Sequence, residues 1–209
     1  MWHVVVALKG WGASKSRLAL PETARRQIVR AMAVDTIAAL TRCPEVQTIS
    51  VLVRDHDLID SPVLRGIDDV VVQPDTTPSL DVALSWFATT QVTVQMPLAV
   101  VVADLPALRA QSLSEVLLQA NEHSFALVAD RAGSGTTVLT ALLATDLDPH
   151  FGTNSAAAHL AAGATLVVSP ADVACDVDTL TDLAHARLLG LGSRTAALLA
   201  NPAWDDWLV

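Results

Sequence analysis

Short apolar runs alternate along the chain with longer segments of helical spacing. Residues 3–8 form a Val-rich run, which predicts a strand buried on both faces. Residues 21–40 begin with Pro21 and Glu22 and carry apolar positions near helical spacing, which predicts a long helix. By the same criteria we expect further strands at 48–53, 98–102, 125–130 and 164–168, helices at 80–89, 113–121 and 179–189, and a loop at 131–137.

This alternation of strands and helices indicates an α/β fold. It predicts a mostly parallel sheet with helices on both faces. The chain contains no tandem repeat, low-complexity tract or evident linker, and its 209 residues suit one domain of ordinary size. We therefore expect a single domain over residues 1–209.

Composition narrows the possible classes of function. The hydrophobic fraction is 52%, but charged residues interrupt every apolar run before the roughly 18 residues that a membrane span requires. No secretory signal precedes residues 3–8, so we expect no membrane association and a cytoplasmic location. The net charge of -9 disfavours nucleic acid as a partner. A phosphorylated substrate would then depend on local cations, metal ions or helix ends.

A cationic, glycine-containing loop follows the first predicted strand. Lys9, Lys15 and Arg17 lie in it with Gly10 and Gly12, so cations and exposed backbone could meet phosphate groups. Its spacing differs from that of a P-loop, which disfavours simple ATPase chemistry. The alternative is an ordinary solvated loop.

Aspartates follow apolar segments at two places. Asp104 ends the run at 98–102, and Asp176 and Asp178 would point the same way from an extended segment. Ligands of open α/β sheets bind beyond the carboxyl ends of the strands, and Mg²⁺ prefers carboxylate oxygens. In the alternative, Asp104 caps a turn, and Asp178 or Thr179 caps the following helix.

Two segments rich in small and hydroxyl residues, at 133–137 and 151–159, could bind a small anion. Backbone N–H groups at Gly152 and Ser155, together with the Ser155 hydroxyl, suit that role. Alternatively, Ser155 is a helix cap, and His159 is structural or supports the site from behind.

Taken in order, these segments resemble a family of guanylyltransferases that makes the phosphodiester precursor of the deazaflavin coenzyme F-420. Each motif is weak alone, but together they span nearly the whole chain. The matching segments are Leu8 and Lys9 with 15–18, then 103–106, 133–136, Phe151 and Gly152 with Ser155 and His159, and 176–179 with Asp182 and Leu183.

The resemblance implies a Rossmann-like nucleotidyltransferase fold, with GTP as donor and a phosphorylated three-carbon acid as acceptor. It implies Mg²⁺, with Mn²⁺ as a substitute, held by Asp104, Asp176 and Asp178. Thr136, Gly152 and Ser155 would bind the acid, while Lys15 and Arg17 act with Asp104 in catalysis. The nucleotide would contact Lys9, Lys15, Arg17, Leu80 and Asp81, where the family's usual Leu-Asn pair reads Leu80-Asp81. We expect Asp81 to accept hydrogen bonds from guanine N1 and N2.

The resemblance implies phosphoenolpyruvate as the favoured acceptor, because the Ala-, Val- and Asp-rich, Lys-poor composition is typical of actinobacteria, where this family is associated with that acid. 2-Phospho-L-lactate and 3-phosphoglycerate are the alternatives. More distant hypotheses are a sugar-nucleotide synthase or glycosyltransferase, and a non-catalytic nucleotide-binding module. As protein partners we expect a downstream transferase that captures the product, and a second copy of the chain. The tail after residue 201 would pack either back on the domain or against that second copy.

Overall fold

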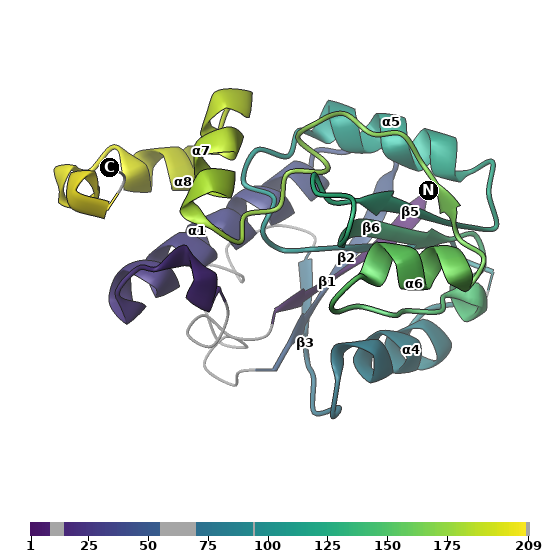
Figure 1. Cartoon of the computed structure of the whole chain (residues 1–209). Helices are drawn as coiled ribbons and strands as arrows, with labels where there is room; N and C mark the ends of the chain where they lie inside the picture. The colour runs from purple at the N-terminus through teal and green to yellow at the C-terminus, as the bar shows by residue number, and fades with distance from the viewer. Residues whose placement is uncertain (9–14, 55–69, 94, 208–209) are drawn as a thin grey trace.

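A twisted seven-stranded sheet forms the centre of the computed structural model (Figure 1). The structure describes residues 1–8, 15–54, 70–93 and 95–207. The strand order is β3-β2-β1-β4-β6-β5-β7. The bounds are β1 Trp2–Leu8, β2 Val46–Val53, β3 Val70–Pro74, β4 Leu98–Val101, β5 Phe125–Ala129, β6 Thr136–Ala141 and β7 Thr165–Leu166.

The direction of chain growth reverses between β1 and β4. Strand β2 pairs in parallel with β1, and β3 pairs in parallel with β2 at the edge of the sheet. The chain then returns to the centre, where β4 pairs in parallel with the other side of β1. Strand β6 is antiparallel to both β4 and β5. Ligands in open α/β sheets bind where strand order reverses, beyond the carboxyl ends of the strands. The topology therefore places a binding crevice beside β1 and β4.

Helices cover both faces of the sheet (Figure 1). Helices α1 (Glu22–Leu40) and α5 (Ala110–Ala120) share a hydrophobic core with Val4 and Val6 of β1. Helices α4 (Leu80–Thr90) and α6 (Ser155–Ala161) pack on the opposite face with Val5. Both faces of β1 are thus buried, which explains its continuous apolar run.

A third hydrophobic cluster extends the molecule beyond the sheet. Helices α7 (Leu180–Leu189) and α8 (Ser193–Leu199) pack there on the first half of α1, and Trp204 of the 3-10 helix η3 (Pro202–Trp207) joins them. Leu18, in the short 3-10 helix η1 (Ser16–Leu18), is fully buried in the same cluster. This packing fixes the position of the residues that follow the first loop.

The α/β class, the mostly parallel sheet and the helices on both faces are confirmed. Four segments differ from prediction. Residues 136–141 form a buried strand, although they begin in the expected loop. Strand β3 and helix α8 were not predicted, and the strand expected at 164–168 is reduced to Thr165–Leu166, whose two side chains are exposed. Among the described residues, no helix is both long enough and apolar enough to cross a membrane.

The buried Asp35 of α1 holds the start of α8. Its two carboxylate oxygens accept hydrogen bonds from the backbone N–H groups of Arg194 and Thr195, at 2.9 and 2.7 Å. A Cβ atom at Gly192 would lie only 2.3 Å from the Asp35 side chain, so glycine permits this close approach. Asp35 therefore caps α8 from a helix that is distant in the sequence.

We predict that Asp35→Ala lowers the free energy of unfolding by roughly 1–3 kcal/mol, because two buried N–H groups lose a charged acceptor. Urea denaturation followed by circular dichroism measures this change. Asp146→Asn, at an exposed position, is the control and should change the free energy by less than about 0.5 kcal/mol. Equal stability of the two variants would show that Asp35 does not cap α8.

Candidate functional site

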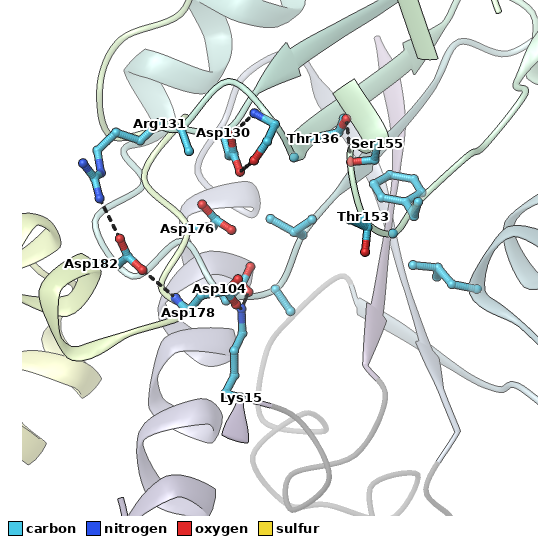
Figure 2. Close-up of a pocket in the computed structure, with 18 of the residues that line it drawn as sticks. Lys15, Asp104, Asp130, Arg131, Thr136, Thr153, Ser155, Asp176, Asp178 and Asp182 are labelled. Carbon is cyan, nitrogen blue, oxygen red and sulfur yellow. Dashed lines mark hydrogen bonds and ion pairs between the residues drawn. The ribbon is translucent and has the colours of Figure 1, made fainter. Parts of the chain in front are cut away.

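A cavity of about 740 Å³ lies at the carboxyl edge of the sheet. Ala7 and Leu8 of β1, the end of β4 and the start of β6 form its floor. Strand β6 contributes its amino end because it runs antiparallel to its neighbours. Loops from five parts of the chain complete the wall, and they carry most of the polar residues that the sequence singled out (Figure 2).

Three carboxylates converge on one side of this cavity. Asp104 follows β4, whereas Asp176 and Asp178 lie on the segment before α7, and one oxygen of each lies within 4.8 Å of the others. Cys175 and Val177 alternate with Asp176 and Asp178 along this segment and are fully buried. The two aspartates therefore point to the same side, as predicted. The Val177 N–H donates to the Asp104 carbonyl at 3.1 Å and joins the two segments.

Lys15 lies among these carboxylates. Its ammonium group contacts Asp104 and Asp178 (Figure 2). Arg17 forms an ion pair with the other oxygen of Asp178. Burial lowers the pKa of Lys15, but the Asp104 and Asp178 carboxylates outweigh it and raise that pKa above its ordinary value. Lys15 is therefore a permanent cation whose charge faces the acidic cluster.

Asp176 has no such cationic partner in direct contact among the described residues. Burial and the nearby charge of Asp104 together raise its pKa to about 7, although Lys15 acts in the opposite direction. The carboxylates of Asp104 and Asp178 thus oppose ionisation of Asp176 even with Lys15 beside them. In addition, Asp104 Oδ1 is buried without a hydrogen-bond donor among the described residues. Both features fit a group of oxygen ligands for a divalent cation.

The capping alternative before α7 is confirmed for Thr179 and not for Asp178. Thr179 is the N-cap of α7 and forms a capping box with Asp182, which leaves the Asp178 carboxylate free of that role. The turn after β4 is held by Thr36, whose hydroxyl accepts the Leu105 N–H at 3.1 Å. Among the described residues, one oxygen of the Asp104 carboxylate contacts Lys15 and the other has no hydrogen-bond donor, so neither caps a turn.

A pair of buried hydroxyls lies on the other side of the cavity. Thr136 begins β6 and Ser155 begins α6, and their hydroxyl oxygens are 3.2 Å apart (Figure 2). Gly152 lines the same wall with φ +139°, a conformation that glycine favours. The Ser155 N–H already donates to the Gly152 carbonyl, so the hydroxyls are better placed than this N–H to meet an anion. The residue preceding α6 is Asn154, so Ser155 is not its N-cap.

Of the other residues predicted to bind the nucleotide, only some line the cavity. Leu80 lines the cavity, whereas the Asp81 carboxylate accepts the Phe151 N–H at 2.8 Å and fixes the loop that carries Gly152. Lys9, with Gly10 and Gly12, lies outside the described residues. Asp81 itself is not among the described residues that line the cavity, and its contact with guanine stays a prediction.

The sequence analysis did not single out Asp130 and Arg131, two further polar residues of this wall. Asp130 directly follows β5, just as Asp104 follows β4. The two segments are similar in sequence, Leu127-Val-Ala-Asp130 and Val101-Val-Ala-Asp104. However, Asp130 accepts the Ser134 N–H at 2.8 Å and so stabilises its own turn. Arg131 pairs with Asp182 at 2.7 Å beside the acidic cluster. The similarity between these two strand endings was the only sequence signal for Asp130.

Solved structures with this fold include several nucleotidyltransferases. A protein from Desulfovibrio desulfuricans G20 described as a nucleotide-diphospho-sugar transferase superposes with a TM-score of 0.77 at 14% identity, covering 99% of this chain and 96% of its own. The 2-C-methyl-D-erythritol 4-phosphate cytidylyltransferase of Francisella tularensis superposes with a TM-score of 0.60 at 15% identity, covering 90% of this chain and 99% of its own. These similarities support the fold.

Sequence comparison is more specific. Proteins named phosphoenolpyruvate guanylyltransferase from Mycolicibacterium paratuberculosis and Salinispora arenicola are each 38% identical to this chain. The matches cover 94% and 97% of this chain and 91% and 95% of the relatives. A family model described as "Guanylyl transferase CofC like" matches residues 2–201. The chain therefore belongs to this guanylyltransferase family.

Proposed function

We propose that the chain joins the GMP moiety of GTP to phosphoenolpyruvate and releases pyrophosphate, a step in the synthesis of coenzyme F-420. The observation that carries the proposal is the division of one cavity into two sides. An acidic cluster with Lys15 lies on one side, and the hydroxyls of Thr136 and Ser155 lie on the other. The names of the curated relatives support the same reaction.

The reaction needs positioning and charge neutralisation more than an enzyme nucleophile. A phosphate oxygen of phosphoenolpyruvate attacks the α-phosphorus of GTP, and the bond from that phosphorus to the α,β-bridging oxygen breaks. The electron pair leaves with pyrophosphate. The acceptor phosphate is already anionic near neutral pH, so no general base is required. Lys15 and Arg17 stabilise the charge that accumulates on the triphosphate.

Asp104, Asp176 and Asp178 would hold Mg²⁺, with Mn²⁺ as a substitute. The bound ion supplies positive charge to the phosphate oxygens. The chain's own contribution is to hold these carboxylates at the edge of the cavity, on two segments joined by the Val177–Asp104 hydrogen bond. Lys15 is placed to move between the carboxylates and the triphosphate, because its ammonium group lies at the same edge.

The side of the cavity formed by Thr136, Gly152 and Ser155, here called the acceptor side, supports a small acid as the acceptor. Thr136, Gly152 and Ser155 surround a space with hydroxyl donors and little bulk. The product is an activated phosphodiester, so a downstream transferase that captures it is a natural partner. A second copy of the chain against the C-terminal helices is part of the same proposal.

The reaction is tested by incubating the protein with Mg²⁺ and each nucleoside triphosphate, combined with phosphoenolpyruvate, 2-phospho-L-lactate or 3-phosphoglycerate. We expect pyrophosphate release to be fastest with GTP and phosphoenolpyruvate, and EDTA to abolish it. GTP binding that is unchanged by EDTA, without pyrophosphate release in any combination, would instead support a binding module.

Asp104→Asn should reduce kcat/KM by roughly a hundredfold or more and weaken Mn²⁺ binding, because the neutral amide is a poorer ligand. Steady-state pyrophosphate assays measure the first effect, and calorimetric Mn²⁺ titration measures the second without turnover. Asp146→Asn is the matched control at an exposed site, where neither quantity should change. Normal Mn²⁺ affinity in Asp104→Asn would exclude Asp104 as a ligand.

Lys15→Met should separate two roles of one side chain. Removing its positive charge should strengthen Mn²⁺ binding to the nucleotide-free protein by roughly tenfold, because the cation no longer competes for Asp104 and Asp178. The same change should slow GTP turnover, since the triphosphate loses a counter-charge. Weaker Mn²⁺ binding in this variant would contradict the competition between lysine and metal.

A further inference from the structure

His159 lies on α6 behind the two hydroxyls of the acceptor side, fully buried and hydrogen-bonded through both ring nitrogens. The backbone N–H of His150 donates to Nε2 at 2.8 Å, and Nδ1 lies 2.9 Å from the Thr136 hydroxyl oxygen. A backbone N–H can only donate, so Nε2 must be the unprotonated nitrogen. A neutral imidazole has one N–H, which is therefore on Nδ1 and donates to Thr136.

The surroundings of the ring keep it neutral. Burial and the nearby His150 together lower the pKa of His159 to about 4, against the opposite effects of Asp81 and Asp148. The ring also packs edge-on against Phe151, with the centroids 5.1 Å apart. Neither the tautomer nor the orientation of the ring is free to change without breaking one of these contacts.

This tautomer determines how many hydroxyl hydrogens remain for a ligand. The bond between the Thr136 and Ser155 hydroxyls uses one of their two hydrogens. Because His159 donates to Thr136 rather than accepting from it, the second hydrogen stays unused by these three side chains. In the opposite tautomer Thr136 would donate to His159 and Ser155 to Thr136, which would leave none.

We propose that His159 is a positioning residue for the acceptor. By donating from Nδ1 to Thr136, it keeps one hydrogen of the Thr136–Ser155 pair available to an oxygen of the phosphorylated three-carbon acid. The inference rests on the proposed function, because it assigns the hydroxyl pair to the acid rather than to the nucleotide. It extends that function to a residue that lies behind the cavity wall and does not itself touch the acid.

Three substitutions of His159 separate the roles of its two nitrogens. His159→Phe keeps an aromatic ring beside Phe151 but removes both nitrogens. His159→Asn can present an N–H near the position of Nδ1, whereas His159→Gln reaches the position of Nε2. We expect the Phe and Gln variants to raise the KM for phosphoenolpyruvate roughly tenfold to a hundredfold, with kcat and the KM for GTP changed less than about threefold. The Asn variant should restore most of the loss.

Leu160→Ala, at an exposed position next to His159 on α6, is the matched control. It should leave the KM for phosphoenolpyruvate unchanged. A double-mutant cycle with Thr136→Val tests the connection itself. If His159 acts through the Thr136 hydroxyl, Thr136→Val combined with His159→Phe should be no worse than Thr136→Val alone.

Several results would overturn the inference. Additive effects in the cycle, equal KM values for the Asn and Gln variants, or parallel changes in the KM values for GTP and phosphoenolpyruvate would each indicate a purely structural histidine. If His159→Phe does not fold, as judged by circular dichroism, the Asn and Gln pair still decides. Absence of turnover in the unmodified protein would instead contradict the proposed function, and calorimetric phosphoenolpyruvate binding by His159→Asn and His159→Gln would then test the positioning role.

Discussion

Crowding of negative charge at one edge of the sheet is the constraint on which the site depends. Asp104, Asp176 and Asp178 lie close enough together to repel one another, and burial makes that repulsion more costly. Lys15 offsets part of it by contacting two of the three carboxylates. The fold holds this arrangement through contacts made elsewhere, in the third hydrophobic cluster and in the hydrogen bond between Val177 and Asp104. A strong electric field is thereby built into the cavity before any substrate enters.

The acidic side of the site was predictable because each aspartate directly follows or interrupts a buried apolar segment. The strand ending at Asp104 and the alternation from Cys175 to Asp178 are local patterns, and local patterns survive in the sequence. The capping alternatives were also local, and the choice between them needed the structure, where Thr179 caps α7. Lys9 and the loop around it lie outside the described residues, so their part in nucleotide binding stays a prediction.

The acceptor side was harder to predict, because it depends on contacts between distant segments. Strand β6 begins at Thr136 within a run of glycine and hydroxyl residues that is typical of a loop, and only pairing with β4 and β5 makes it a strand. Helix α8, outside the site, was missed for a similar reason. It is short and depends on Asp35, which lies on α1 far away in the sequence. Neither pairing leaves a periodic pattern along the chain. Tertiary contacts of this kind override local propensity.

The antiparallel direction of β6 connects the two sides of the site. It brings the amino end of a strand to the edge where the parallel strands end, so Thr136 lies across the cavity from Asp104. The buried His159 can therefore act on the acceptor side without approaching the acidic cluster. The fold is shared with proteins named as cytidylyltransferases and sugar transferases at about 14–15% identity, so the sheet alone does not select a reaction. In the proposed function, specificity for the acid depends on residues such as Thr136, Ser155 and His159, whose mutual hydrogen bonds leave one hydroxyl hydrogen for the acceptor.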